Sequence, residues 1–277
     1  MELTRAAIEQ VVQLALREDV GAGDLTSEAV IPASARCSAE IVLEEGGVLC
    51  GLGAAGAVFE ALDPDARIEV LVEEGSLLAH PPVVLARIRG RARAVLSAER
   101  IALNLLGRLC GIATLTARYV ERVEGTGALI LDTRKTTPGL RALERYAVRC
   151  GGGSNHRDGL YDGILLKENH LRLAGGISAA LAALGEVNGT PVEVEAETLA
   201  EVAEALEAGA PRILLDNMTV AQVEQAVAAV AGRALLEASG GISLESVRAY
   251  AETGVDFISV GALTRAAPAL EVALEVT

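Results

Sequence analysis

The sequence predicts an α/β fold in which a small, mostly antiparallel sheet precedes a longer region built on a parallel sheet. After residue 127, short apolar runs alternate with helical patterns, and the later runs begin about 22 residues apart, which is the spacing of βα units. Residues 35–90 instead contain short runs of β-type residues parted by Gly and Pro. Each apolar run after residue 127 ends in polar residues or glycine. That pattern is typical of an α/β barrel, in which the strand ends share one mouth.

The N-terminal part begins with an expected amphipathic helix at 2–18, followed by a glycine-rich turn at 19–30. The antiparallel strands of 35–90 should enclose one helix at 54–62. Arginines alternate along the last of these strands, from Arg87 to Arg93, and form either a solvated face or an anion patch. A long helix is expected from Ser97, as its N-cap, to Arg122. Because its middle is apolar almost all round, it should join two domains or form an interface.

The second part predicts six strands, so the barrel should be incomplete. The expected strands are 128–133, 162–169, 191–197, 212–217, 234–241 and 257–262, and the expected helices are 198–208, 219–231 and 243–253, with another after Pro138 that stops at Gly151–Gly153. The predicted domains are 1–107 and 108–264. The tail, 265–277, reads as a strand that returns to the N-terminal sheet.

Composition excludes several classes of function. The net charge of −14, with 2% aromatic residues and no Trp, argues against nucleic-acid binding, which uses basic grooves and stacking rings. The longest charge-free stretch, 46–59, is shorter than the roughly 20 residues of a membrane helix. The charged N-terminus does not resemble a signal peptide, so a cytoplasmic protein is expected. The four cysteines show no CxxC spacing and are expected to be free thiols rather than disulfides or zinc ligands.

Residues 131–170 reverse the overall charge. Of 24 basic residues only two are lysine, Lys135 and Lys167, and both lie in this segment. A compact ammonium differs physically from a guanidinium fork, so these positions should need a point charge or a titratable amine. The segment also contains two of the three histidines and five arginines, which are His156, His170, Arg134, Arg141, Arg145, Arg149 and Arg157. An anionic ligand is therefore expected here.

Other residues at the predicted strand ends suggest the rest of that ligand. Glycines at 239–242 and 260–263 follow the last two strands, where barrels often bind phosphate. Glu195 and Asp216 end neighbouring strands, where they could meet ribose hydroxyls or Mg²⁺. Arg134, His156, Arg157 and Lys167 would suit a ligand with more than one carboxylate.

At this point the sequence resembles a known family. The motifs SAERIALN, DTRKTTPGLRALERYAVRCGGGSNHRDGLYDGILLKENH, VEVEAE, LLDN, EASGGI and SVGALT, with GDLTSEAV and GGVLCG nearer the start, are similar to those of quinolinate phosphoribosyltransferase, also called nicotinate-nucleotide pyrophosphorylase (carboxylating). The resemblance implies a type II phosphoribosyltransferase, with an N-terminal α/β sandwich joined to an open α/β barrel. It implies conversion of quinolinate and phosphoribosyl pyrophosphate into nicotinate mononucleotide, pyrophosphate and carbon dioxide in NAD biosynthesis. Mg²⁺ would be needed, and no organic cofactor.

The resemblance also implies a role for each site residue. Lys135, Lys167, Glu195 and Asp216 would be catalytic, and Glu195 and Asp216 would also face Mg²⁺, directly or through water. Substrate binding would involve these four together with Thr133, Arg134, His156, Arg157, Ser239, Gly240, Gly241, Val260, Gly261 and Ala262. Arg100 would reach the site of a neighbouring subunit, in a dimer or a multiple of dimers.

Three alternatives remain open on the sequence alone. A Schiff-base aldolase would also place a single lysine, such as Lys167, at a barrel strand end. A non-catalytic phosphate-binding barrel would keep the glycines without needing the acids. The molybdenum-associated relatives of the family share the barrel, although DTRKTTPGLR followed by NHR favours quinolinate as the substrate.

Overall fold

The structure, a computed structural model, describes residues 3–185, 187 and 189–277. These form two compact units. The first contains the described residues up to Ala117 together with Thr136–Gly152 and Leu263–Thr277, and the second contains Arg118–Lys135 and Gly153–Ala262. The boundary expected at residue 107 falls inside one continuous helix, α4 (Ala92–Val123).

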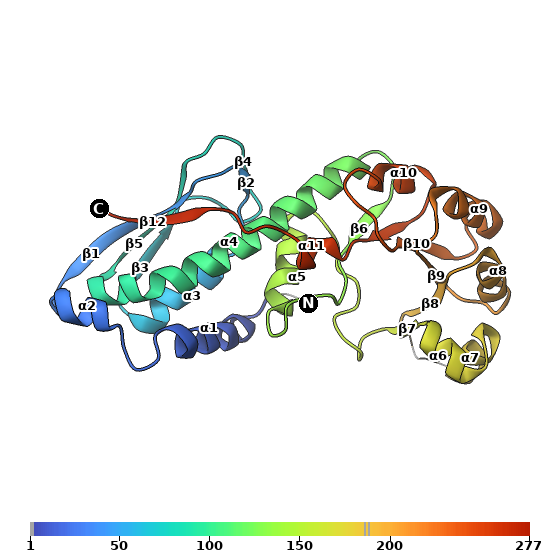
Figure 1. Cartoon of the computed structure of the whole chain (residues 1–277), viewed down its shortest axis with the longest axis horizontal. Helices are drawn as coiled ribbons and strands as arrows, with labels where there is room; N and C mark the ends of the chain where they lie inside the picture. The colour runs from blue at the N-terminus through green and yellow to red at the C-terminus, as the bar shows by residue number, and fades with distance from the viewer. Residues whose placement is uncertain (1–2, 186, 188) are drawn as a thin grey trace. The chain divides into compact units, whose positions relative to one another are not determined.

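The first unit is built on an antiparallel sheet of order β12-β1-β5-β3, as expected (Figure 1). The strands β2 and β4 form a separate two-stranded antiparallel sheet. Besides α4, its elements are α1 (Arg5–Asp19), α2 (Leu25–Val30), β1 (Arg36–Leu43), β2 (Gly47–Val48), α3 (Leu52–Leu62), β3 (Arg67–Val70), β4 (Leu77–Leu78), β5 (Val83–Arg91), α5 (Arg141–Cys150) and β12 (Val272–Val276). The short α11 (Ala262–Arg265) leads into it from the second unit.

The sheet has one buried and one exposed face. Along β5, Ala86, Ile88 and Gly90 are buried, whereas the arginines between them are exposed. Arg87 pairs with Glu40 at 2.8 Å and Arg91 with Asp63 at 3.1 Å. Arg87 and Arg91 therefore lie on a solvated face with acidic partners. The expectation for Arg93 was wrong, because Arg93 lies in helix α4 and donates to the Ile31 and Glu28 carbonyls.

Several local expectations were wrong. The glycine-rich stretch 19–30 contains helix α2, because Asp24 caps it by accepting the Ser27 amide at 3.0 Å. Helix α4 begins at Ala92, directly after β5, and Ser97 is an interior residue whose hydroxyl donates to Asp24 at 2.9 Å. Helix α5 begins at Arg141 rather than just after Pro138, since a turn closed by the Leu140 amide on the Thr137 carbonyl intervenes. The first helix begins at Arg5; residue 2 of the expected helix lies outside the described residues.

The C-terminal tail returns to the first unit. Strand β12 pairs with β1, with Val276 opposite Ala39. Just before it, the tail runs against α4, where the Leu270 amide donates to the Gly107 carbonyl at 3.0 Å. One helical turn later, a Cβ added at Gly111 would lie 1.8 Å from the Pro268 carbonyl oxygen. Two glycines one turn apart therefore allow the tail to approach the helix backbone.

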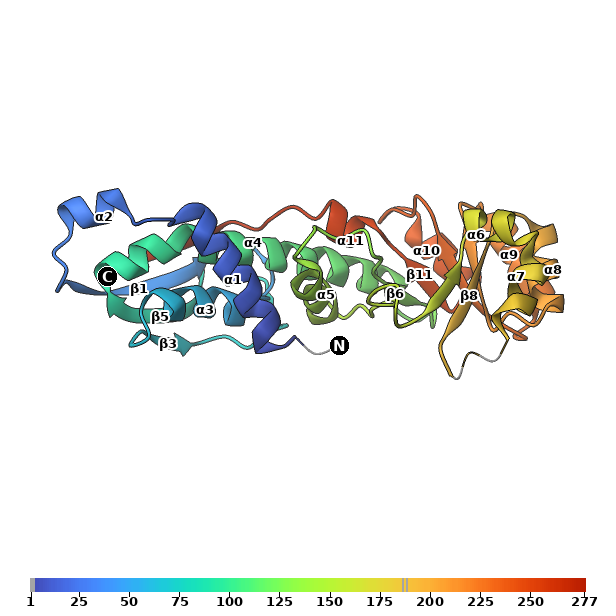
Figure 2. The same ribbon diagram turned by 90° about the horizontal axis from the view of Figure 1, so that it is seen from below.

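The second unit contains a six-stranded parallel sheet of order β6-β11-β10-β9-β8-β7. Figure 2 labels strands β6, β11 and β8 of this sheet together with the helices of the unit. Its strands are β6 (Leu129–Leu131), β7 (Ile164–Leu166), β8 (Val192–Ala196), β9 (Arg212–Asp216), β10 (Leu235–Ser239) and β11 (Phe257–Ser259), and its helices are α6 (Glu168–Ala174), α7 (Ile177–Leu184), α8 (Leu199–Glu207), α9 (Val220–Val230) and α10 (Val247–Glu252). All six expected strands are confirmed, each within a few residues. Helices α6 and α7 were not expected.

The barrel is open. Within the part of the chain that the structure describes, the edge strands β6 and β7 do not pair with each other. The segment after Gly153 instead adds to the edge of β6, through a parallel bridge between Ser154 and Leu131. None of the helices in the described ranges is long and apolar enough to cross a membrane. The four cysteines are free, as expected, with Cys50 and Cys110 buried and the other two half-buried.

The close approach at Gly111 gives a stability prediction. Gly111→Ala should lower the free energy of unfolding by about 2 kcal/mol or more, because a methyl group there collides with backbone that can move only by displacing the tail. Gly53→Ala is the matched control: it lies in helix α3 with no atom within 4 Å of the added carbon. That change should be neutral or stabilising by up to about 1 kcal/mol. Denaturant unfolding measures the free energy of unfolding of both variants. Equal effects of the two changes on that free energy would contradict the close packing at Gly111.

Candidate active site

The parallel register places the expected site residues along one edge of the sheet. Asp216 ends β9 opposite Ser239, the last residue of β10, which in turn lies opposite Ser259 of β11. Glu195 lies in β8, while Lys167 directly follows β7 and caps helix α6. The segment after β6 carries Thr133, Arg134 and Lys135. The carboxyl ends of all six strands therefore contribute to one mouth.

The two lysines converge on the acids of this mouth. The Lys167 Nζ and Glu195 Oε2 atoms form an ion pair at 2.7 Å, with the lysine half-exposed and the glutamate largely buried. Burial, and then the Glu195 charge, raise the pKa of Asp216, while Lys167 and Lys135 act in the opposite direction. Asp216 therefore lies within the electrostatic reach of both lysines and of Glu195.

Three carboxylates gather at this edge. Oxygen atoms of Glu195, Glu197 and Asp216 all lie within 4.8 Å of one another. Carboxylate oxygens are the ligands that Mg²⁺ prefers. The residues present therefore fit the expected divalent cation, and they add Glu197, which the sequence analysis did not name. Glu193 and Glu195 alternate along β8, and Glu197 continues this alternation one residue past the end of the strand, so the period could have pointed to it.

The loops after β10 and β11 are closely packed around glycines. Gly240 and Gly241 have φ values of +98° and +64°, which favour glycine. A Cβ at Gly240 would lie 2.2 Å from Asn217 Oδ1, and Asn217, itself at φ +54°, donates its side-chain amide to Asp216 at 2.6 Å. A Cβ at Gly261 would lie 3.1 Å from Lys135 Cδ. Glycine at these positions therefore leaves room for the lysine and for the side chain that holds Asp216.

The three residues after β11 differ in what they can offer. The Val260 amide already donates to the Leu131 carbonyl at 2.9 Å, so it is used in the sheet. Gly261 and Ala262 follow it, and Ala262 begins the short helix α11. Of the residues expected to hold a phosphate here, Val260 is thus the least suited to donate its amide.

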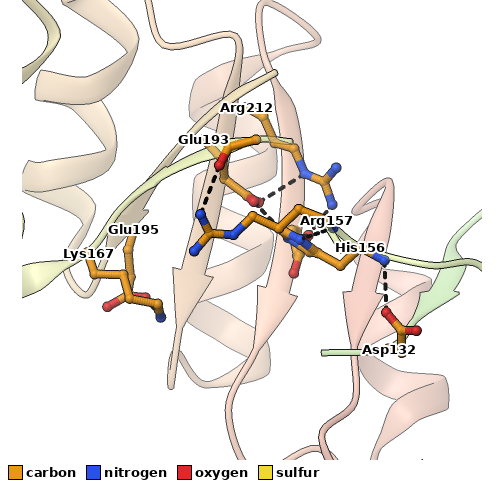
Figure 3. Close-up of polar contacts among 9 residues, drawn as sticks. Asp132, His156, Arg157, Lys167, Glu193, Glu195 and Arg212 are labelled. Carbon is orange, nitrogen blue, oxygen red and sulfur yellow. Dashed lines mark hydrogen bonds and ion pairs between the residues drawn. The ribbon is translucent and has the colours of Figure 1, made fainter. Parts of the chain in front are cut away.

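His156 is held on three sides (Figure 3). Its backbone amide donates to Asp132 at 2.9 Å, and its Nδ1 accepts the Arg157 amide at 2.8 Å. Because Nδ1 is an acceptor, the proton lies on Nε2, which donates to Glu193 Oε2 at 2.8 Å. Both ring nitrogens are engaged within the protein, and His156 thereby fixes the backbone of Arg157.

A buried charge cluster lies behind the histidine. Arg212 pairs with Glu193 at 2.9 Å and also with Glu237, while its guanidinium carbon lies 4.1 Å from the centre of the Phe257 ring. Burial raises the pKa of Glu237, and the Glu193 charge raises it further. Burial also acts to raise the pKa of Glu193, but the hydrogen bond from His156 and the Arg212 charge outweigh it, so the net shift is downward. We call these four residues, His156, Glu193, Arg212 and Glu237, the buried cluster.

Two arginines near the buried cluster are arranged to bind an anion. The Arg157 Nη1 atom donates to the Gly163 carbonyl at 2.9 Å, and burial together with the Arg134 charge lowers the pKa of Arg157. The Nε atom of Arg134 is buried without a hydrogen-bond partner among the described residues. A carboxylate would satisfy that donor and offset the repulsion between the guanidinium groups.

Not all of the cationic segment belongs to the second unit. Arg141, Arg145 and Arg149 belong to helix α5 of the first unit; Arg149, for example, lies over the Tyr146 ring. Arg100 is on helix α4, also in the first unit, with a side chain that is 68% exposed. The remaining expected site residues are all in the second unit. The sequence indicated Glu193 only as a polar residue at a strand end and did not point to Arg212 or Glu237, because the role of all three comes from pairing between strands.

The fold and the site together define an α/β enzyme with an open parallel barrel and a charged mouth suited to anionic substrates. Two family models match the chain: quinolinate phosphoribosyl transferase, N-terminal domain, at residues 24–110, and quinolinate phosphoribosyl transferase, C-terminal domain, at residues 112–275. The chain therefore belongs to the quinolinate phosphoribosyltransferase family.

Named relatives agree with this assignment. The chain is 43% identical over 262 residues to a probable nicotinate-nucleotide pyrophosphorylase (carboxylating) of Bacillus subtilis, covering 94% of this chain and 90% of the relative. It is 39% identical over 290 residues to quinolinate phosphoribosyltransferase (decarboxylating) 1b of Nicotiana tabacum, covering 97% of this chain and 82% of the relative. The crystal structure of NadC from Streptococcus pyogenes matches with a TM-score of 0.94 and 38% identity, over 100% of this chain and 99% of that one.

The buried cluster gives a prediction for stability. Glu193→Ala should lower the free energy of unfolding by about 3 kcal/mol or more, because it removes a buried carboxylate that pairs with the buried Nε atom of Arg212 and accepts the hydrogen bond from His156. Glu252→Ala in the same unit removes an exposed ion pair with Arg248 and should cost less than about 1 kcal/mol. Urea unfolding followed by circular dichroism compares the two, and similar losses would show that the buried cluster does not stabilise the barrel.

Proposed function

We propose that this protein converts quinolinate and phosphoribosyl pyrophosphate into nicotinate mononucleotide, pyrophosphate and carbon dioxide, a step of NAD biosynthesis. The observation that carries the proposal is the pairing of two kinds of subsite in one mouth. Arg134 and Arg157 present guanidinium groups to a carboxylate, while Lys135, Lys167, Glu195 and Asp216 form a mixed-charge group beside them. A pyridine dicarboxylate would bind at the arginines, and a ribose phosphate that reacts with it would bind at the mixed-charge group beside them.

The quinolinate subsite follows from the chemistry of its donors. Quinolinate carries two adjacent carboxylates, so one can meet the arginines while the other meets a lysine ammonium. Lys167 would exchange its bond to Glu195 for the substrate carboxylate, which its half-exposed position permits. His156 would act by fixing Arg157, since its ring nitrogens are already bonded. The expectation that His156 itself touches quinolinate stays a prediction.

The second substrate would occupy the opposite side of the mouth. Ser239, Gly240, Gly241, Gly261 and Ala262 would surround its 5-phosphate, at the place where barrels often bind phosphate. Glu195, Glu197 and Asp216 would hold Mg²⁺, directly or through water, and Mg²⁺ when bound would neutralise the pyrophosphate group. Thr133 would keep Lys135 in place, because its hydroxyl accepts the Lys135 amide at 3.1 Å.

The reaction would proceed by charge stabilisation rather than by a covalent enzyme intermediate. The pyridine nitrogen attacks C1 of the ribose as pyrophosphate leaves, and positive charge develops on the ring in an oxocarbenium-like transition state. Glu195 and Asp216 are the acids placed to stabilise it. The pyridinium then accepts the electron pair of the breaking bond to the adjacent carboxylate, carbon dioxide leaves, and the carbon takes up a proton. The chain needs no organic cofactor for this.

A Schiff-base enzyme is the main alternative, and the geometry disfavours it. A lysine that attacks a carbonyl must be neutral, which usually requires a pocket without a counter-ion. Lys167 is instead in an ion pair with Glu195. Borohydride with a carbonyl substrate would trap an aldolase covalently and leave a transferase unmodified.

We further propose a cytoplasmic homo-oligomer in which Arg100 completes the site of another subunit. The four free thiols suit a reducing compartment. The Arg100 side chain is exposed, and its only ion-pair contact among the described residues is a 3.9 Å approach to the neighbouring Glu99. An exposed guanidinium on a largely apolar helix is suited to an interface.

Substrate discrimination is the direct test of the function. Purified protein with Mg²⁺, phosphoribosyl pyrophosphate and quinolinate should release carbon dioxide and nicotinate mononucleotide. Nicotinate, which has one carboxylate, should react with a kcat/KM lower by about a hundredfold or more, because a cation in the mouth would lose its partner. Comparable turnover of the two acids would rule out a site built for two carboxylates.

Subunit mixing tests the role of Arg100. Arg100→Ala and Glu195→Ala should each be inactive, but in a mixed dimer one site receives an intact Arg100 from the partner and keeps its own Glu195. Activity should therefore return to roughly half of the wild-type value per mixed dimer once subunits exchange under mild denaturation. Mixing either variant with the double variant is the matched control and should restore nothing. If mixed dimers form, as seen by mass spectrometry, and stay inactive, Arg100 serves its own subunit.

A further inference from the structure

A group of cysteines in the first unit has no part in the proposed reaction. Cys50 lies just before helix α3, and Cys150 is the last residue of helix α5. Their sulfur atoms and a Glu74 carboxylate oxygen all lie within 4.8 Å of one another. The two thiols are therefore close neighbours inside the first unit. Two sulfur atoms from distant parts of the sequence thus meet without being bonded.

The third member of the group has other partners. Glu74 accepts the backbone amides of Gly51 and Leu52 at 2.6–3.0 Å and the Tyr146 hydroxyl at 3.4 Å. It therefore satisfies the N-terminus of helix α3, whose positive partial charge repels a cation. Binding a metal here would remove that cap. The group is accordingly better suited to sulfur chemistry than to metal binding.

The two thiols differ in a way that assigns them separate roles. Cys150 is half-buried, and the neighbouring Cys50, followed by Tyr146, acts to lower the pKa of Cys150. Cys50 is 0% exposed, and the neighbouring Cys150, followed by burial, raises the pKa of Cys50. A reagent from solvent can therefore reach Cys150, which is also the better thiolate, whereas Cys50 is reached only from within.

The remaining cysteines provide comparisons within the same chain. Cys110 is also buried, burial raises its pKa to about 12, and its sulfur both accepts the Cys50 amide and donates to the Cys50 carbonyl at 3.3 Å. It is thus held away from solvent and engaged with backbone. Cys37, on strand β1, is half-buried like Cys150. Burial alone raises the pKa of Cys37, and no other thiol contributes to that change. Cys37 is the matched control for exposure without a partner.

We propose that Cys50 and Cys150 are a redox-reversible pair that forms an intramolecular disulfide on reaction with a low-molecular-weight disulfide. The Cys150 thiolate attacks one sulfur of the reagent, forming a mixed disulfide and releasing one thiolate. Cys50 then gives up its proton and attacks the Cys150 sulfur, forming the internal bond and expelling the second thiolate. The protein loses two electrons and two protons, and the reagent is reduced to two thiols.

The crosslink would join the start of helix α3 to the end of helix α5. That end is already tightly packed, since a Cβ at Gly151 would lie 2.3 Å from the Ala113 carbonyl oxygen of α4. Closing so long a loop restricts the unfolded chain, so the oxidised protein should melt at a higher temperature, by about 5 °C or more. The pair would therefore protect the first unit under oxidising conditions without requiring its rearrangement.

The experiment treats the whole protein with oxidised glutathione, alkylates the remaining thiols and maps the tryptic peptides by mass spectrometry. The expected product is a Cys50–Cys150 disulfide that dithiothreitol reverses, in the wild type and equally in Cys37→Ser. Cys50→Ser should stop at a glutathione adduct on Cys150, because the second attack is lost. Within the wild-type chain, Cys150 should react at least about tenfold faster than Cys37.

Several results would overturn the proposal. A crosslink from Cys50 to Cys110 would show that Cys150 is not the partner of Cys50. Equal reaction rates at Cys150 and Cys37 would show that the Cys150 thiol is not activated. Stoichiometric zinc binding by the wild type that Cys50→Ser abolishes would identify a metal site instead. The rate comparison uses the unmodified chain, so it decides the matter even if Cys50→Ser fails to fold.

Discussion

The pairing of charges inside the parallel sheet is the constraint on which the site depends. Glu193, Arg212 and Glu237 come from three adjacent strands, β8, β9 and β10; both acids are buried, and Arg212 is partly buried. Charges in such a position are tolerated only when each meets a partner of opposite sign. Two acids and one arginine leave an excess of negative charge, and the Nε2–H group of His156 donates a hydrogen bond to one of these acids, Glu193. The barrel interior thus requires a donor at this point in space.

The open edge of the barrel allows that donor to arrive. Because β6 and β7 do not pair with each other in the described residues, the segment from Ser154 can run along β6 and turn inward. Asp132 at the end of β6 fixes the His156 backbone, and His156 in turn fixes the Arg157 amide (Figure 3). The position of Arg157, which we propose binds a substrate carboxylate, is therefore determined by charges inside the barrel. A closed barrel would leave no entry for this segment.

The sequence was informative where a periodic pattern or a composition change decided the structure. The six strands and their parallel order followed from apolar runs at βα spacing, and the mouth followed from the residues after each run. The two lysines of this arginine-rich chain both act to lower the pKa of Asp216, and their contact with an anionic ligand stays a prediction. Errors arose where a hydrogen bond overrode composition. Asp24 caps helix α2 within a glycine-rich stretch. The turn at Thr137 makes helix α5 begin later than expected. Pairings across strands, such as Glu193 with Arg212, have no local signal in the sequence.

The overall charge explains why the site is built from ion pairs rather than from free cations. A chain with net charge −14 repels anionic substrates at long range, so its mouth needs a local excess of positive charge. Unpaired cations would destabilise the empty site by mutual repulsion, as the effect of Arg134 on the Arg157 pKa illustrates. Pairing Lys167 with Glu195 removes part of that repulsion, and the half-exposed ammonium can still exchange its partner for a substrate carboxylate. In the proposed reaction, Glu195 would then be released to face the ribose, where positive charge would develop. The same ion pair would therefore stabilise the empty site and supply the carboxylate that the reaction requires.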